Sequence, residues 1–164
     1  KIFFLIIIIF FQNYSFASEK IAFVDLDYVI NKSKIGSKVL KELENVNKSN
    51  LKKLNLIKTK IDKNKEEIIK TKNVVSESEL KSKIDEQKKS IIEFDQTKIK
   101  LEKEINELRR KKMLEIVKMI NPLLEKYMEE NSIEVLLKKD SIYLSKKNYD
   151  ITKQILDLVN KNIK

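Results

Sequence analysis

The sequence contains no cysteine, histidine or tryptophan, and only one glycine and one proline in 164 residues. Without Cys or His the chain has no zinc-finger ligands, no disulfide framework, no haem-binding His and no Cys–His or Ser–His nucleophile. One glycine cannot form a P-loop or a G-x-G-x-x-G turn, so the common nucleotide-binding fingerprints are excluded as well. We therefore expect no enzymatic activity, no metal site and no cofactor, and an exported enzyme is the least supported class.

The first 17 residues differ in composition from the rest of the chain. Lys1 is followed by an unbroken apolar run, Ile2 to Phe11, and then by Ser15-Phe16-Ala17, a small-x-small pattern. A charged start, a short apolar stretch and a small-residue site are typical of a cleavable secretory signal peptide, and the apolar run is short for a membrane span. We expect residues 1–17 to be a signal peptide cut after Ala17, so that the mature chain is exported.

Short strand patterns lie at both ends of the remaining chain. The run Ile21 to Leu26 is rich in β-forming residues. Near the other end, Ile133 to Leu137 and Ile142 to Leu144 flank a short polar segment, which predicts a strand–turn–strand unit. We expect residues 18–34 and 119–164 to form a small β-rich body that ends in an amphipathic helix.

Two long runs with heptad spacing lie between the strand patterns. Apolar residues alternate at spacings of three and four on both sides of a short break near residues 72–78, which is the pattern of a coiled coil. Since the runs have similar lengths, we expect residues 35–118 to form an antiparallel helical hairpin with its tip in that break. Ser76-x-x-Glu79 matches a capping box that starts the second helix, and Asp150 is the expected N-cap of the final helix. The predicted fold class is α+β, mostly α, with a long antiparallel coiled-coil hairpin projecting from a small β-body.

The heptad positions also predict how the two helices align. Pairs whose residue numbers sum to 148, such as Leu54 with Phe94, give more wholly apolar layers than pairs that sum to 155. The predicted seam is interrupted by four polar residues, and polar seam positions lower the stability of a coiled coil while helping to fix its alignment. We therefore expect helical arms that are soft towards the tip. The polar seam residues are Asn47, Asn64, Gln87 and Lys98.

The net charge of +10 is concentrated in the predicted hairpin. Residues 32–118 hold 25 basic and 15 acidic residues, so the remainder of the chain is neutral overall. Basic arms on an exported protein would attract anionic clients and anionic membrane surfaces, although an AT-rich genome would also favour Lys codons. The residues considered for contacts with an anionic client or an anionic lipid are Lys88, Lys89, Arg109, Arg110, Lys111 and Lys112. For the dense run 109–112, a solvated helix face is the competing interpretation.

The two end segments resemble the Skp/OmpH family of periplasmic chaperones. Lys20 to Glu44 (KIAFVDLDYVINKSKIGSKVLKELE) carries the strand, the V-D-L and the Ser-x-x-Gly around Gly36 of the family pattern. Asn131 to Lys161 carries strand, turn and strand, and then Asp150-Ile151-Thr152 at the start of the last helix. The hairpin between these segments is a generic coiled coil and adds little to the resemblance.

The resemblance implies a homotrimer whose strands build a central body, with three hairpins projecting like tentacles around a cavity. It further implies an ATP-independent holdase that keeps unfolded outer-membrane β-barrel proteins from aggregating. On this basis the residues expected in the oligomerisation body are Ile21, Phe23, Val24, Leu26, Ile133, Val135, Leu137, Ile142 and Leu144.

Two other classes compete with the chaperone interpretation. An exported structural coiled-coil protein would explain the heptads but not the strands at the chain ends. A protein that binds nucleic acid would explain the charge but neither the signal peptide nor the presence of only two Arg, and no nucleic-acid partner is expected. An anionic-lipid-binding protein remains a further alternative.

Overall fold

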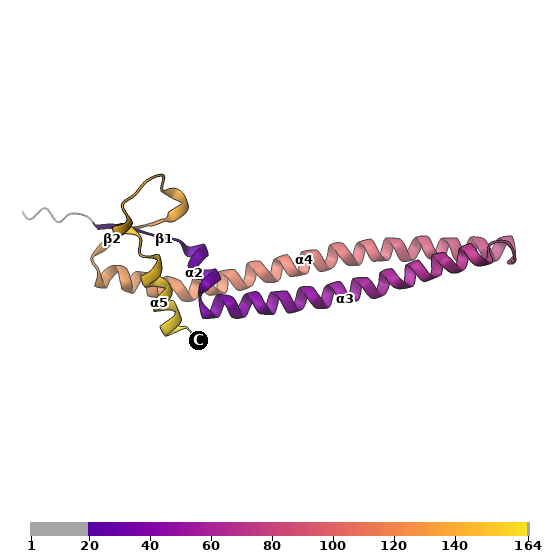
Figure 1. Cartoon of the computed structure of the whole chain (residues 1–164), viewed down its shortest axis with the longest axis horizontal. Helices are drawn as coiled ribbons and strands as arrows, with labels where there is room; N and C mark the ends of the chain where they lie inside the picture. Colours follow the sequence, from indigo (N-terminus) through magenta and orange to yellow (C-terminus); the bar gives the residue numbers. More distant parts are fainter. Residues whose placement is uncertain (1–19, 164) are drawn as a thin grey trace, which may run out of the picture.

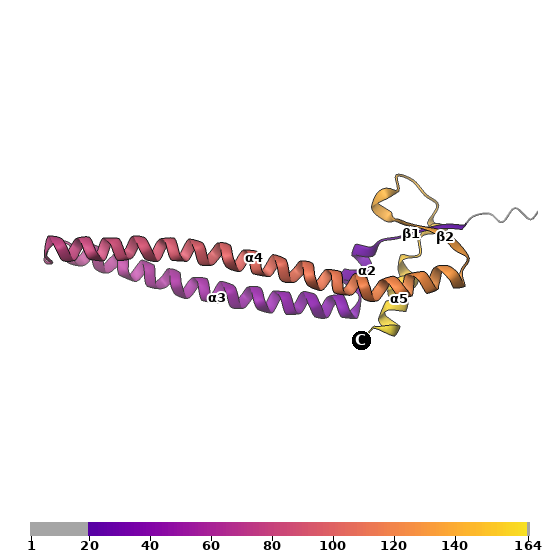
Figure 2. The same ribbon diagram turned by 180° about the vertical axis from the view of Figure 1, so that it is seen from behind.

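The computed structural model describes residues 20–163, so the expected signal peptide lies outside the described residues. Figure 1 shows a long arm of two helices at one end and a small body of strands and short helices at the other, and Figure 2 shows the same arrangement from behind. The elements are β1 (Lys20–Val24), α2 (Leu26–Lys32), α3 (Lys34–Thr71), α4 (Glu77–Glu130), β2 (Ile133–Lys138) and α5 (Thr152–Asn162). The predicted fold class, a mostly helical α+β chain with a long hairpin, is confirmed.

The body contains a parallel pair of strands. β1 pairs with β2 in a register that sets Ile21 beside Val135 and Phe23 beside Leu137. Parallel strands need a crossover connection, and here the crossover is the entire arm together with α2. The arm is therefore inserted in the sequence between two strands, and the pairing of these strands keeps the two ends of the arm together.

The prediction of a strand at residues 142–144 is wrong. The residues after β2 form a 3₁₀ turn, Lys139–Ser141, and Ile142 to Leu144 pair with no strand in the described part of the chain. The four connecting residues, Lys138 to Ser141, could form a hairpin loop without positive φ, so the difference lies in the choice of partner strand and not in the turn. β2 pairs with β1 instead, and the segment after it is left as an exposed loop.

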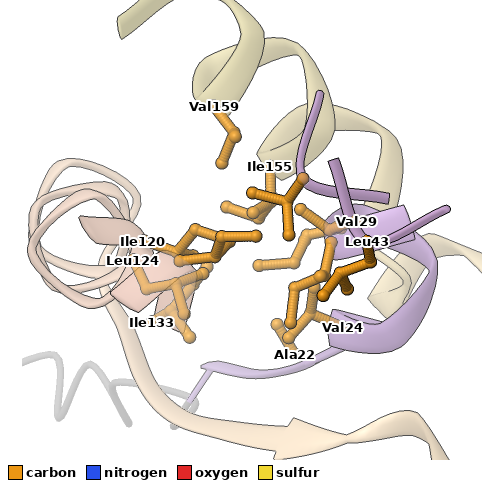
Figure 3. Packing of buried hydrophobic residues seen from close by; sticks show 13 residues of the cluster. Ala22, Val24, Val29, Leu43, Ile120, Leu124, Ile133, Ile155 and Val159 are labelled. Atoms are coloured by element: carbon orange, nitrogen blue, oxygen red, sulfur yellow. The ribbon is translucent and has the colours of Figure 1, made fainter. Parts of the chain in front are cut away.

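The hydrophobic core lies where α4 crosses the strands and α5. Figure 3 shows Ile120 and Leu124 of α4 facing Ile155 and Val159 of α5, with Val24 of β1 close by. Ile120 and Val24 are each 1% exposed, and Ile155 and Val159 are fully buried. α4 thus belongs both to the arm and to the body, because it runs unbroken from one to the other.

The root of the arm is a tightly bonded junction between α2 and α3. Ser33 is fully buried; its hydroxyl donates to the Ile30 carbonyl oxygen at 3.1 Å and accepts from the Gly36 N–H at 3.1 Å. The Lys34 N–H donates to Oδ1 of Asn160 on α5 at 2.8 Å. Two side chains thus satisfy N–H groups that an α-helix leaves free in its first turn.

The expected helix caps are found, with one displacement. Ser76 is the N-cap of α4 and accepts from the Glu79 N–H at 3.3 Å. At the last helix, Ile151 rather than Asp150 is the N-cap residue, since the helix starts one residue later than expected. The Asp150 carboxylate still accepts a hydrogen bond from the Thr152 N–H at 2.9 Å, so it caps a free N–H at the start of the helix as predicted.

Candidate functional surfaces

The described residues offer surfaces rather than an enclosed chemical site. No group of Asp and Glu among residues 20–163 is arranged to hold a metal ion, and no helix of this region is long and apolar enough to cross a membrane. The hollows along the arm are shallow and open between α3 and α4, such as one of about 140 Å³ lined by Asn50, Leu54 and Leu101. The features that can bind a partner are therefore the arm faces and the outer surface of the body.

The seam of the arm departs from the predicted heptad positions. Leu40, Ile84 and Ile91 occupy heptad positions of the sequence pattern, which places them in the predicted seam, but they are 39%, 38% and 43% exposed. The heptad line does not drift out of the interface, because positions 80, 87, 94, 101 and 108 stay less exposed along α4; the intermediate contacts fall at 83, 90 and 97, one residue before the expected 84, 91 and 98. The less exposed positions of the two helices are 39, 43, 46, 50, 54, 57, 61 and 68, and 80, 83, 87, 90, 94, 97, 101, 105 and 108.

The predicted alignment of the helices agrees with contacts in the outer arm. The Gln87 side-chain amide donates to the Ile61 carbonyl oxygen at 3.0 Å, and these residue numbers sum to 148. Lys83 and Glu67 form an ion pair across the arm at 3.2 Å, close to the same alignment. The 155 alignment would displace Gln87 from Ile61 by seven residues, about 10 Å along a helix.

Gln87 divides the arm into two parts of unequal apolar content. On its body side the seam holds Leu54, Phe94 and Leu101, whereas between the layer of Gln87 and Ile61 and the tip only Ile68, Val75 and Leu80 are apolar and less exposed. Oε1 of Gln87 is buried and has no hydrogen-bond partner among the described residues. A buried polar atom without a partner costs about 1–3 kcal/mol, so this layer weakens the outer arm.

Replacing Gln87 by leucine is expected to stabilise the outer arm. Leucine removes the buried oxygen and adds an apolar layer, so amide hydrogen exchange at residues 62–86 should slow by about tenfold, which corresponds to about 1.4 kcal/mol. Gln96→Leu is the matched control because Gln96 is exposed on the same helix. Equal exchange in the Gln87 variant and the wild type would contradict the role of this layer.

The arm also carries large apolar side chains on its outer faces. Ile92 and Ile99 are 57% and 66% exposed and lie seven residues apart on one face of α4. Leu51, Leu56 and Ile69 of α3 are 52%, 67% and 56% exposed. Lysines lie between these residues along both helices. These scattered apolar side chains and positive charges do not form one shaped ligand site on the arm.

The six basic residues considered for anion binding do not form one patch. Successive residues of an α-helix point about 100° apart, so Arg109, Arg110, Lys111 and Lys112 are distributed around α4. Lys112 pairs with Glu42 of α3 at 3.1 Å, and Lys88 with Asp85 at 3.6 Å. Lys88 and Lys89 lie about 30 Å from the other four along the helix. A single phosphate-binding site is not assembled from these residues.

One acidic residue of the arm is held in its charged form by a neighbour. Lys48 lies 2.6 Å from Glu44, and its hydrogen bond and positive charge lower the pKa of the Glu44 carboxyl. Both groups are exposed, so this pair adds little stability.

The residues expected in the oligomerisation body fall into two groups. Phe23, Val24 and Ile133 are buried within the single chain, and Leu26 and Ile142 are partly covered. The remaining four are exposed: Ile21 at 44%, Val135 at 40%, Leu137 at 39% and Leu144 at 87%. Only this second group is free to contact another molecule.

The outer face of the two-stranded sheet is apolar. Because side chains alternate between the faces of a strand, Ile21, Val135 and Leu137 lie on the face opposite Ala22 and Val24, which pack into the core. Sequence analysis missed Tyr143, which is fully exposed next to Leu144. The sequence Ile-Tyr-Leu favours a β-strand, which could have drawn attention to Tyr143. Only the fold shows that this tripeptide pairs with no strand among the described residues.

Comparison of the chain with known proteins identifies a matching family and a solved structure with a similar fold. Residues 20–159 match the model of the family described as outer membrane protein (OmpH-like). No curated protein matches the chain significantly. Among solved structures, an OmpH-like protein from Caulobacter crescentus, proposed to be an outer membrane chaperone, is similar with a TM-score of 0.81 and 15% identity, over 90% of this chain and 87% of that one.

Proposed function

Because the chain belongs to the OmpH-like family, whose members are chaperones without enzymatic activity, we propose that it is an ATP-independent periplasmic holdase. Its clients would be unfolded outer-membrane β-barrel proteins, held between basic helical arms so that they do not aggregate. The observation that carries this proposal is the arm itself, a helical projection about 57 Å long with exposed apolar side chains and excess positive charge.

The two kinds of arm residue would contribute differently to holding a client. Exposed isoleucines and leucines gain free energy by burying apolar surface of the unfolded chain, at about 25 cal/mol per Å². Residues 32–118 hold 25 basic and 15 acidic residues, and this positive charge attracts anionic clients. The range of the attraction is set by the Debye length, about 8 Å at physiological salt. Because the basic residues are spread out, attraction to lipopolysaccharide or an anionic membrane would be diffuse and salt-sensitive.

We further propose that three copies assemble through the body, as the family resemblance implies. α4 and α5 cover one face of the two-stranded sheet, but Ile21, Val135 and Leu137 leave apolar side chains exposed on the other face, and an exposed apolar patch marks an interaction surface. A second copy would cover these side chains and place the arms side by side around a shared space.

The holdase proposal is tested by adding the protein to a urea-diluted outer-membrane β-barrel protein and following light scattering. Stoichiometric amounts, counted per trimer, should suppress aggregation at moderate salt without ATP. Ile92→Ser together with Ile99→Ser should weaken client binding by about tenfold, because two exposed apolar contacts worth about 1.4 kcal/mol in total are removed.

Gln96→Ser is the matched control, since Gln96 is an exposed polar residue on α4 between the two isoleucines. It should suppress aggregation as well as the wild type does. Failure of the wild-type protein to reduce scattering would sink the holdase proposal. Equal activity of the wild type and the double isoleucine variant would instead remove these residues from the client surface.

A further inference from the structure

A shallow groove runs along one face of the arm near its root. A hollow of about 280 Å³ at the body end and one of about 140 Å³ farther out share two lining residues, Asn47 and Ile105, so the two are continuous. Leu40 and Leu43 of α3 line the body end and are 39% and 4% exposed. Apolar side chains from both helices therefore line the body end of the groove.

The charges along this groove are matched except at its body end. Lys48 lies 2.6 Å from Glu44, and Lys98 lies 4.0 Å from Glu102. Arg109 belongs to the same lining, and it forms no ion pair within residues 20–163. The unpaired charge of the groove is thus positive and lies beside its apolar part.

An anion that suits this groove must carry an apolar group close to its charge. The planar guanidinium of an arginine binds a carboxylate through two parallel hydrogen bonds, and Arg109 has Leu40 and Ile105 as neighbours in the lining. In a polypeptide, only the C-terminal residue carries both a carboxylate and a separate apolar side chain, since Asp and Glu use their side chain for the charge. A hollow of about 280 Å³ is at the small end of ligand pockets, which suits one residue and not a folded segment.

We propose that the groove binds the C-terminal residue of an unfolded client, when that residue is apolar. Arg109 would bind its α-carboxylate, and Leu40 and Ile105 would contact its side chain. Lys98 lines the outer end of the groove, about 16 Å from Arg109 along α4, so about five preceding residues of an extended chain would fit along it. This inference rests on the proposed holdase function, and it names the part of the client that one place on the arm recognises.

Binding of labelled peptides of about ten residues, measured by fluorescence anisotropy, tests this contact. The peptides share one sequence that ends in Phe, with either a free C-terminal carboxylate or a carboxamide. The wild type should bind the acid at least about tenfold more tightly than the amide, because only the acid pairs with Arg109. Arg109→Gln should bind both peptides equally. Arg110→Gln is the matched control, since Arg110 is the exposed next residue of α4 and does not line the groove, and it should keep the preference for the acid.

A peptide of equal charge separates the groove from general attraction to a basic arm. A carboxamide peptide with one added internal Glu has the net charge of the acid, and it should bind as weakly as the plain amide. Leu40→Ser should weaken binding of the acid by about fivefold, because an apolar contact is lost. Leu56→Ser should leave this binding unchanged, since Leu56 is an exposed leucine of α3 outside the groove.

Equal binding of acid and amide by the wild type, or a preference that survives in Arg109→Gln, would overturn the contact. If the two peptides bind equally while Arg109→Gln weakens binding to phosphatidylglycerol vesicles, the groove serves an anionic lipid and the proposal is wrong. A wild type that suppresses aggregation in the scattering assay but shows no preference for the acid overturns this inference alone. Loss of both peptide binding and aggregation suppression would overturn the proposed function as well.

Discussion

Replacing Gly36 by alanine is expected to lower the free energy of unfolding by about 3 kcal/mol or more. A Cβ at position 36 would overlap the carbonyl group of Ile30 in the preceding helix. That carbonyl also accepts the Ser33 hydroxyl, so it cannot move without breaking the junction that starts α3. The single glycine of the chain is therefore required by close backbone approach and not by an unusual φ.

Urea unfolding followed by circular dichroism at one fixed protein concentration measures this effect, since stability depends on concentration if copies associate. Ser37→Ala is the matched control, because Ser37 is the exposed next residue of the same helix, and it should change stability by less than about 0.5 kcal/mol. A Gly36→Ala protein as stable as this control would show that α2 and α3 separate without penalty.

Replacing Ile155 by alanine is expected to destabilise the protein by about 2–5 kcal/mol. Ile155 is fully buried where α5 packs against the strands and α4, and removal of its outer carbons would leave a cavity that a closely packed core cannot close. Because α5 also caps α3 through Asn160, the loss should loosen the arm root as well. Suppression of client aggregation is expected to fall with it.

Ile99→Ala makes the same chemical change on the arm, where the side chain is 66% exposed. Its thermal midpoint should stay close to that of the wild type, whereas the midpoint of Ile155→Ala should fall by several degrees. If the two variants melt together, α5 is not part of the cooperative body.

The arm was the most predictable part of the fold because its signals are local. Heptad spacing requires only the residues of one helix, and the capping residue Ser76 lies three positions before Glu79, whose N–H donates to its hydroxyl. The exact seam was less predictable, since it depends on which of two neighbouring side chains, such as Ser90 or Ile91, faces the other helix. Leu40 and Ile91 consequently lie outside the interface that the sequence pattern assigned to them.

The candidate surfaces were predictable in kind but not in place. The sequence identified a basic arm, yet consecutive basic residues such as Arg109 and Arg110 point in different directions once the helix forms. Ile21 and Val24 look alike in the sequence, but Val24 is 1% exposed and Ile21 is 44% exposed. Which strand residue enters the core depends on which face of the sheet α4 and α5 cover.

The sequence by itself determined the absence of the common catalytic motifs, the helical arm and the strand-forming ends, because these follow from residue types and short-range spacing. Only the tertiary structure decided that β1 and β2 pair in parallel across the whole arm and that Ile142 to Leu144 joins no strand within residues 20–163. Strand pairing depends on contacts between residues more than a hundred positions apart, and the local preference of a tripeptide does not determine whether a partner strand is within reach.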